Sequence, residues 1–263
     1  MIKELLCFDV DGTLRDNVHH QVSESTLKAL KVLKENGYKC VISSGRGVDS
    51  LSQTGLMEMG IWDGYVCNNG QVVLDSNGNE LFHAKMDKAA VIQVIDIANQ
   101  LGYATVVKSQ PRFITKEPDE YVLESQRYFK NVIPEIGEYQ GQDVDALIVY
   151  GPLHYDYAPF LSVKGVQVLP GESTYADITI GSVSKATGIQ QLLDLYQLEE
   201  YIAFGDSLND VEMFKYAKTS VAMGQGNEYL KSIATHVTDT IDNDGIYKAC
   251  IYLGMIKEEL SYE

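Results

Sequence analysis

The stretch Leu5–Leu14, which reads LLCFDVDGTL, decides the fold of this chain. Its first four residues are all apolar, which is typical of a strand buried on both faces of a parallel sheet. The apolar run stops at Asp9, and Asp11 and Gly12 follow in a loop. Functional residues of open α/β sheets lie at the carboxyl ends of the strands. We therefore expect Asp9 and Asp11 to face one site.

Two carboxylates two residues apart suggest a catalytic site. Such a pair repels itself unless a cation lies beside it. It suits a nucleophile next to a general acid or base, with a metal ion that neutralises the charge. A turn rich in Asp and Gly is the alternative explanation. However, the pattern Asp-x-Asp-Gly-Thr-Leu specifies the residue at five positions, and a chance match is rare.

Strands and helices alternate on both sides of a central insert, which predicts a parallel α/β sheet. Before the insert the pattern predicts strands at 5–8, 40–42 and 65–67, helices after Ser23 and near 49–59, and a hairpin at 72–82. After the insert it predicts a helix from Ser184 to 195, strands at 201–204 and 220–223, and helices at 208–216, from 227 and near 245–253.

The insert has a different composition of elements. It predicts helices at 87–101 and 118–129 and strands at 104–107, 113–115, 146–149, 166–169 and 177–180. The fold class is therefore α/β, with a Rossmann-like parallel sheet core of residues 1–82 and 183–263. An α+β domain of residues 83–182 is inserted into that core.

Three further polar motifs follow strands or begin helices of the predicted core. Residues 43–46 (SSGR) end a strand, where a hydroxyl and backbone N–H groups can bind an anion. Lys185 begins a helix and offers a cation. In residues 205–210 (GDSLND), a helical turn stacks Asp206 and Asp210 on one side, and carboxylate oxygens suit Mg²⁺. Each alone has an ordinary explanation, but parallel strands bring them to one edge, which predicts a phosphoryl-transfer site.

Together these motifs resemble the haloacid dehalogenase-like (HAD) superfamily, specifically its Cof-like phosphatases with an α+β cap domain. The family's order of Asp-x-Asp, Ser/Thr, Lys and Asp-x-x-x-Asp is kept across essentially the whole chain. The insert lies between the second and third motifs, where the family carries its cap. The resemblance implies a Mg²⁺-dependent phosphatase that hydrolyses a small-metabolite phosphomonoester through an aspartyl phosphate. Sugar phosphates are the first substrate class to expect, then flavin or pyridoxal phosphates.

The resemblance also implies roles for single residues. It gives Asp9 as the nucleophile and Asp11 as the general acid and base. For phosphate or substrate binding it implies Ser44, Gly45, Asn69, Lys185 and Asn209. For the metal it implies Asp9, Asp11 through its backbone carbonyl, Asp206 and Asp210. The chain departs from the family where Ser44 replaces a more usual Thr and where Ala186 replaces the glycine after the lysine.

Composition limits the partners. The 263 residues carry a net charge of −16, which argues against non-specific binding to nucleic acid or to an anionic membrane. No apolar run approaches the ~18–20 residues of a membrane helix, and the amino terminus does not resemble a signal peptide. The four cysteines lack metal-type spacing and are expected as thiols of a reducing compartment. We expect a cytoplasmic protein whose partner is a small phosphate ester; the oligomeric state stays open.

Two alternatives have different requirements. A phosphosugar mutase of the same superfamily would need extra Arg or Lys in the insert to hold a bisphosphate, and the eight basic residues there form no dense cluster. A non-catalytic binding or regulatory module would not need the intact set of Asp9, Asp11, Lys185, Asp206 and Asp210.

Overall fold

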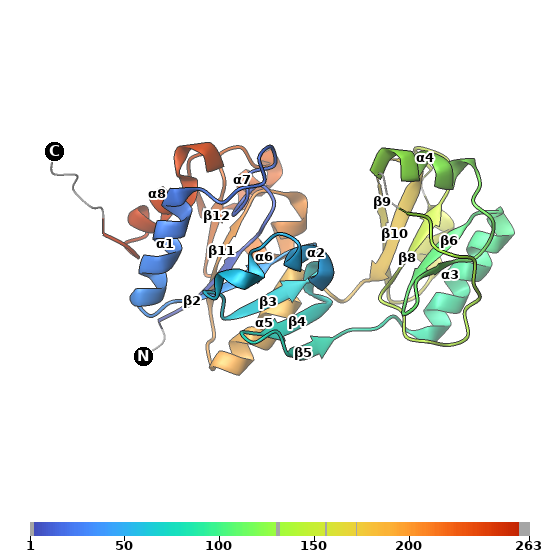
Figure 1. The fold of residues 1–263 in the computed structure, drawn as a ribbon, viewed down its shortest axis with the longest axis horizontal. Helices are drawn as coiled ribbons and strands as arrows, with labels where there is room; N and C mark the ends of the chain where they lie inside the picture. Colours follow the sequence, from blue (N-terminus) through green and yellow to red (C-terminus); the bar gives the residue numbers. More distant parts are fainter. Residues whose placement is uncertain (1–2, 130–131, 156, 172, 258–263) are drawn as a thin grey trace. The chain divides into compact units, whose positions relative to one another are not determined.

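The computed structural model describes residues 3–129, 132–155, 157–171 and 173–257. The chain divides into two compact units. Unit 1 comprises Met1–His83 and Val183–Glu263, and unit 2 comprises Ala84–Ser182. Each unit has its own sheet and its own helices (Figure 1).

Unit 1 contains a mainly parallel sheet. In the described residues its strand order is β13-β12-β11-β1-β2-β3-β4-β5. Neighbours from β13 to β3 pair in parallel, and β4 and β5 complete one edge in antiparallel. The strands are β1 (Leu5–Phe8), β2 (Lys39–Ser43), β3 (Gly64–Cys67), β4 (Val72–Asp75), β5 (Glu80–His83), β11 (Tyr201–Gly205), β12 (Thr219–Ala222) and β13 (His236–Val237). All four residues of β1 are fully buried, which confirms the strand expected from the apolar run.

Helices cover both faces of this sheet. They are α1 (Glu24–Glu35), α2 (Val48–Ser52), α5 (Lys185–Tyr196), α6 (Val211–Tyr216), α7 (Glu228–Ile233) and α8 (Gly245–Tyr252). Leu30 of α1 and Ala249 of α8 pack in one apolar cluster with alternate residues of β1. Leu192 of α5 and Phe214 of α6 pack in another with the remaining residues of β1. The core of unit 1 is thus two apolar layers on either side of the sheet.

Two predicted N-caps are confirmed. The Ser23 hydroxyl accepts a hydrogen bond from the backbone N–H of Thr26 at the start of α1. At the start of α5, Ser184 and Thr187 form a capping box. Because a cap satisfies N–H groups that the helix itself cannot, it fixes where the helix begins. The cap at Ser184 therefore fixes Lys185 as the first residue of α5.

The helix predicted near 49–59 is wrong as a single element. It ends with α2 at Ser52, and a 3₁₀ turn follows at Met57–Met59. Gly55 lies between them with φ of +75°, a left-handed conformation that interrupts a right-handed helix. The helix predicted at 208–216 also begins differently, with a 3₁₀ turn at Leu208–Asp210 before α6. The short strand β13 had no sequence signal.

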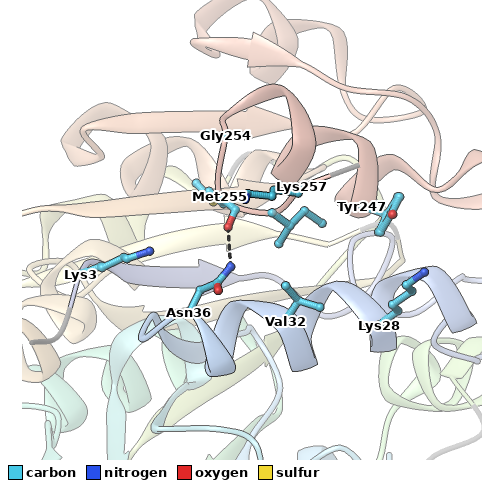
Figure 2. A pocket seen from close by; sticks show the side chains of 9 residues that line it. Lys3, Lys28, Val32, Asn36, Tyr247, Gly254, Met255 and Lys257 are labelled. Atoms are coloured by element: carbon cyan, nitrogen blue, oxygen red, sulfur yellow. Dashed lines mark hydrogen bonds between the residues drawn. The ribbon is translucent and has the colours of Figure 1, made fainter. Parts of the chain in front are cut away.

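A hollow of about 490 Å³ lies between α1, α8 and residues 254–257. Figure 2 shows the side chains that line it. The Asn36 Nδ2 group donates to the Met255 carbonyl oxygen at 2.9 Å. The ammonium of Lys28 lies 5.8 Å from the centre of the Tyr247 ring. These two contacts join α1 and its C-cap to α8 and to the segment that follows α8.

Unit 2 contains an antiparallel sheet with strand order β7-β6-β8-β10-β9 in the described residues. Its elements are α3 (Lys88–Leu101), β6 (Thr105–Lys108), β7 (Phe113–Ile114), α4 (Glu120–Phe129), β8 (Ala146–Tyr150), β9 (Val166–Pro170) and β10 (Tyr175–Ile180). Val94 of α3 packs in a cluster with Val149 of β8, whereas Val122 of α4 packs in a separate cluster with Tyr150. The helices therefore cover opposite faces of the sheet. Across the described parts of both units, no helix has the length and apolar character that crossing a membrane requires.

Candidate active site

The predicted site residues of unit 1 come together at the carboxyl edge of the parallel strands. Asp9 directly follows β1, Ser44 follows β2, and Asp206 follows β11. Asn69 comes two residues after β3. Since β11, β1, β2 and β3 are neighbours and run in parallel, their carboxyl ends lie side by side.

A buried ion cluster lies at the end of β1. The side chain of Lys185 is fully buried, and its Nζ donates to Asp9 Oδ1 at 2.5 Å and to Asp210 Oδ1 at 2.6 Å. A buried charge is tolerated when it is paired and hydrogen-bonded, and here one ammonium is shared by two carboxylates. We call Asp9, Lys185, Asp206 and Asp210 the buried cluster.

Asp210 is held rigidly within this cluster. Its Oδ2 accepts the backbone N–H groups of Asp206 at 3.0 Å and Ser207 at 3.1 Å. A Cβ added at Gly205 would lie 2.6 Å from the carboxyl carbon of Asp210, so only glycine fits there. Asp210 therefore braces both Lys185 and the backbone that carries Asp206.

The loop after β1 also approaches Asp206 closely. Thr13 Oγ1 donates to Asp206 Oδ1 at 3.1 Å. Gly12 has φ of +86°, and a Cβ there would overlap the Asp206 carboxylate. Gln225 Nε2 donates to the Gly12 carbonyl oxygen at 2.5 Å. Sequence reasoning assigned no role to Thr13 or Gln225; Thr13 belongs to the opening motif, whereas Gln225 had no signal.

The buried cluster has the donor set of a divalent-cation site. Asp9, Asp206 and Asp210 each offer a carboxylate oxygen, and these atoms lie within 4.8 Å of one another. Hard oxygen ligands suit Mg²⁺. Three carboxylates and one ammonium together carry a formal charge of −2, which a divalent cation would balance. The residues present therefore fit a metal ion.

Burial shapes the ionisation of this cluster. It raises the pKa of Asp9 to about 8, although Lys185 acts in the opposite direction. It raises the pKa of Asp206 to about 6, and the charge of Asp210 adds to that rise. Burial by itself lowers the pKa of Lys185, but Asp9 and Asp210 outweigh it and raise that pKa. Lys185 is therefore an ammonium, and both aspartates release their protons less readily than an exposed aspartate does.

Asp11 has a separate partner. Arg46 Nε donates to Asp11 Oδ2 at 2.6 Å, and Arg46 Nη2 donates to Asp11 Oδ1 at 2.8 Å. Arg46 belongs to the motif of residues 43–46, but the sequence predicted no role for it. Its position directly after Ser44 and Gly45 was the signal that could have pointed to it. We call this contact the Asp11–Arg46 fork.

A third group of polar atoms completes the edge. Asn209 Nδ2 donates to Asn69 Oδ1 at 3.3 Å. A Cβ added at Gly45 would lie 3.2 Å from Asn69 Oδ1 and 3.3 Å from Asn209 Nδ2, so the three residues meet. The backbone N–H of Asn69 donates to the Ser44 carbonyl oxygen at 3.0 Å. Amide donors at this edge can stabilise oxyanions.

Every site residue predicted from the sequence belongs to the buried cluster, the Asp11–Arg46 fork or this third group. Among the described residues, none of them lines the hollow of Figure 2.

The comparisons with known proteins agree with the fold. The sequence model of the haloacid dehalogenase-like hydrolase family matches residues 6–250, and the chain belongs to that family. The chain is 29% identical to the putative phosphatase YkrA of Bacillus subtilis (strain 168), over 98% of this chain and 100% of that protein. It is 30% identical to the 5-amino-6-(5-phospho-D-ribitylamino)uracil phosphatase YitU of the same organism, over 92% of this chain and 94% of that protein.

Solved structures show the same architecture. The HAD subclass IIB sugar phosphatase BT4131 is similar with a TM-score of 0.79 and 26% identity, over 97% of this chain and 100% of that chain. Because the chain is similar to phosphatases of this family over nearly its full length, it is a HAD-like phosphatase. It has a parallel core sheet and a separate antiparallel sheet. The family, the fold class and the enzyme class predicted from the sequence are thereby confirmed.

Proposed function

We propose that the chain hydrolyses a small-metabolite phosphomonoester with Mg²⁺ through an aspartyl phosphate on Asp9. The observation that carries the proposal is the position of Asp9. Its carboxylate lies at the end of the central strand, against the fully buried ammonium of Lys185, and within reach of the Asp206 carboxylate. A nucleophilic carboxylate needs such a fixed cation, because the phosphoryl group it attacks is itself anionic.

In the first step, a carboxylate oxygen of Asp9 attacks phosphorus, and the bond between phosphorus and the ester oxygen breaks. Lys185 holds the other oxygen of Asp9 and so fixes the direction of attack. Asp11 gives its proton to the departing oxygen, which leaves as an alcohol. Asp9 and Asp206 would hold Mg²⁺, which would supply positive charge to offset the negative charge of the phosphoryl group.

In the second step, Asp11 takes a proton from a water molecule that attacks the aspartyl phosphate. The bond between Asp9 and phosphorus breaks, and inorganic phosphate and the free Asp9 carboxylate result. Asp11 thus acts as an acid in one step and as a base in the next. The amides of Asn69 and Asn209, which meet beside Gly45, would orient the phosphoryl oxygens together with the hydroxyl of the preceding residue, Ser44.

The names of similar proteins support the substrate class. YitU acts on a phosphorylated ribitylamino-uracil and BT4131 is named as a sugar phosphatase. We therefore place sugar phosphates first among the substrates of this chain, followed by flavin and pyridoxal phosphates.

The same proposal assigns the two parts of the chain. Residues 1–82 and 183–263 form the catalytic core domain, and residues 83–182 form the cap domain. We also place the protein in the cytoplasm. The four cysteines support this placement, because all are buried and unpaired, as is common in a reducing compartment.

The test is phosphate release from a panel of sugar, nucleotide, flavin and pyridoxal phosphates, with Mg²⁺ and with EDTA. Release should require Mg²⁺ and should disappear in the Asp9→Asn variant. Undiminished release in EDTA, or from Asp9→Asn, would contradict the proposed chemistry. The ranking of esters by kcat/KM identifies the substrate class.

A further inference from the structure

Asp11 is more exposed than Asp9, the other carboxylate to which we assign a role in the reaction. Its side chain is 37% exposed, and a short exposed side chain can rotate between positions. Proton transfer to a departing oxygen requires the acid within hydrogen-bond distance and in the right direction. Some neighbour must therefore fix the Asp11 carboxylate if it is to act as proposed above.

Arg46 has the geometry to do this. Its Nε and Nη2 groups contact the two oxygens of Asp11 at 2.6 Å and 2.8 Å. Two parallel bonds from a planar guanidinium fix both the position and the plane of a carboxylate, which a single bond cannot do. Since Asp11 and Arg46 are 35 positions apart, this contact also joins the loop after β1 to the loop after β2.

Arg46 is itself anchored at three points. Its backbone N–H donates to the Ser44 hydroxyl oxygen at 3.1 Å. Its carbonyl oxygen accepts the backbone N–H of Asn68 at 2.8 Å. Its Nη1 group donates to Ser50 Oγ of α2 at 3.0 Å. The backbone of Arg46 is therefore fixed by Ser44 and Asn68, and its guanidinium by Ser50 in addition to Asp11.

We propose that Arg46 is a positioning residue that holds the Asp11 carboxyl group in the orientation for proton transfer to the departing oxygen. This inference rests on the acid role proposed for Asp11. Arg46 keeps its own protons throughout, because a guanidinium does not lose a proton in a protein. The proton that moves is the one on Asp11, and the fork then stabilises the carboxylate that is left behind.

This role differs from binding the substrate, and the leaving group distinguishes the two. An alkyl alcohol is a poor leaving group and needs a proton, whereas 4-nitrophenolate leaves without one. A residue that acts through Asp11 should therefore matter for alkyl esters and much less for 4-nitrophenyl phosphate. A residue that binds the phosphoryl group should matter equally for both, because both esters carry the same group.

The experiment measures kcat/KM for the best alkyl ester of the panel and for 4-nitrophenyl phosphate, in Arg46→Ala, Arg46→Lys and Asp11→Asn. Arg46→Ala should lower the alkyl value on the order of 10²-fold, the lower end of what acid catalysis contributes, and the aryl value far less. Arg46→Lys should recover only part of the alkyl rate, since a point charge cannot form the fork. Adding Arg46→Ala to Asp11→Asn should bring no further selective loss.

Two other variants keep the test independent of folding. Ser50→Ala removes one anchor of the guanidinium without touching Asp11. It should lower kcat/KM for the alkyl ester more than for 4-nitrophenyl phosphate, but by less than Arg46→Ala does. Arg15→Ala is the matched control, because the Arg15 side chain lies in the loop after β1 but donates to the His20 carbonyl oxygen. It should change neither ester.

Equal losses on both esters, or an undiminished effect of Arg46→Ala in the Asp11→Asn background, would overturn the inference while leaving the proposed function intact. If Asp11→Asn itself showed no preference between the esters, the acid role of Asp11 would fail, and the role of Arg46 with it.

Discussion

Asp9 and Asp11 are two residues apart and each contacts a cation, yet their surroundings differ sharply. The Asp9 side chain is 6% exposed and its partner Lys185 is 0% exposed. The Asp11 side chain is 37% exposed and its partner Arg46 is 29% exposed. Lys185 shares a point charge between two carboxylates, whereas Arg46 contacts both oxygens of one.

The difference fits the two chemical roles that we propose for these residues. A buried carboxylate with a fixed cation keeps one direction of attack and is shielded from bulk water, which suits a nucleophile. A carboxyl group near solvent can gain and lose protons during turnover, which suits an acid and base. Burial and the shape of the partner separate the roles, and the sequence spacing alone does not.

The largest effect on kcat should come from replacing each of the two carboxylates by an amide. Asp9→Asn should lower kcat on the order of 10⁶-fold, the scale at which removal of a nucleophile abolishes turnover. Asp11→Asn should lower kcat on the order of 10²- to 10⁴-fold, the contribution of acid–base catalysis. Steady-state rates on one alkyl ester compare them directly. An Asp9→Asn enzyme faster than Asp11→Asn would reverse the assignment.

The second effect concerns stability. Lys185→Ala would leave the Asp9 and Asp210 carboxylates buried without their cation. It should lower the free energy of unfolding by about 3–5 kcal/mol, the cost of breaking a buried ion pair from one side. Lys218→Ala is the matched control, because Lys218 bonds Glu4 and Glu200 at the surface and should change little. Denaturant titration without Mg²⁺ measures both, and equal losses would refute the distinction.

The smallest effect is the pH dependence of Mg²⁺ binding. Because burial raises the pKa of Asp9 to about 8 and that of Asp206 to about 6, both hold protons as the pH falls below these values. A cation binds the deprotonated oxygens and must displace those protons. Mg²⁺ affinity should therefore fall as the pH drops from about 8 to about 6.

Titration calorimetry in buffers with different protonation enthalpies measures the protons released. Asp11→Asn should keep this pH dependence, since its carboxylate lies outside the buried cluster. A Mg²⁺ affinity that stays constant over this range, or a dependence that disappears in Asp11→Asn, would place the titrating groups elsewhere.

The sequence was informative where the signal is local. The apolar run 5–8 predicts β1 because a strand buried on both faces must be apolar throughout. Strand ends then predict the shared edge, because parallel neighbours bring their carboxyl ends together. The same reasoning gathered Asp9, Ser44 and Asp206 although they lie far apart in the chain.

The sequence did not predict contacts that depend on the direction of a side chain. The Asp11–Arg46 fork joins two loops, and the orientation of either side chain follows only from how β1 and β2 pair. The break after α2 depends on the left-handed backbone of Gly55, which glycine permits but does not require. Gln225 reaches Gly12 across 213 positions, a contact that no local pattern indicates.

The central claim is that the buried Asp9, and not Asp11, carries the phosphoryl group. The most direct measurement mixes 4-nitrophenyl phosphate labelled in its phosphoryl group with an excess of Asp11→Asn. This ester should phosphorylate the enzyme without an acid, whereas breakdown of the phosphoenzyme should be slow because the base is missing. The reaction is quenched in acid, and the labelled peptide is mapped by mass spectrometry. Label should appear on Asp9, and it should be absent from the double variant that carries both Asp9→Asn and Asp11→Asn. Label on another residue, or phosphate released without any labelled enzyme, would contradict the account.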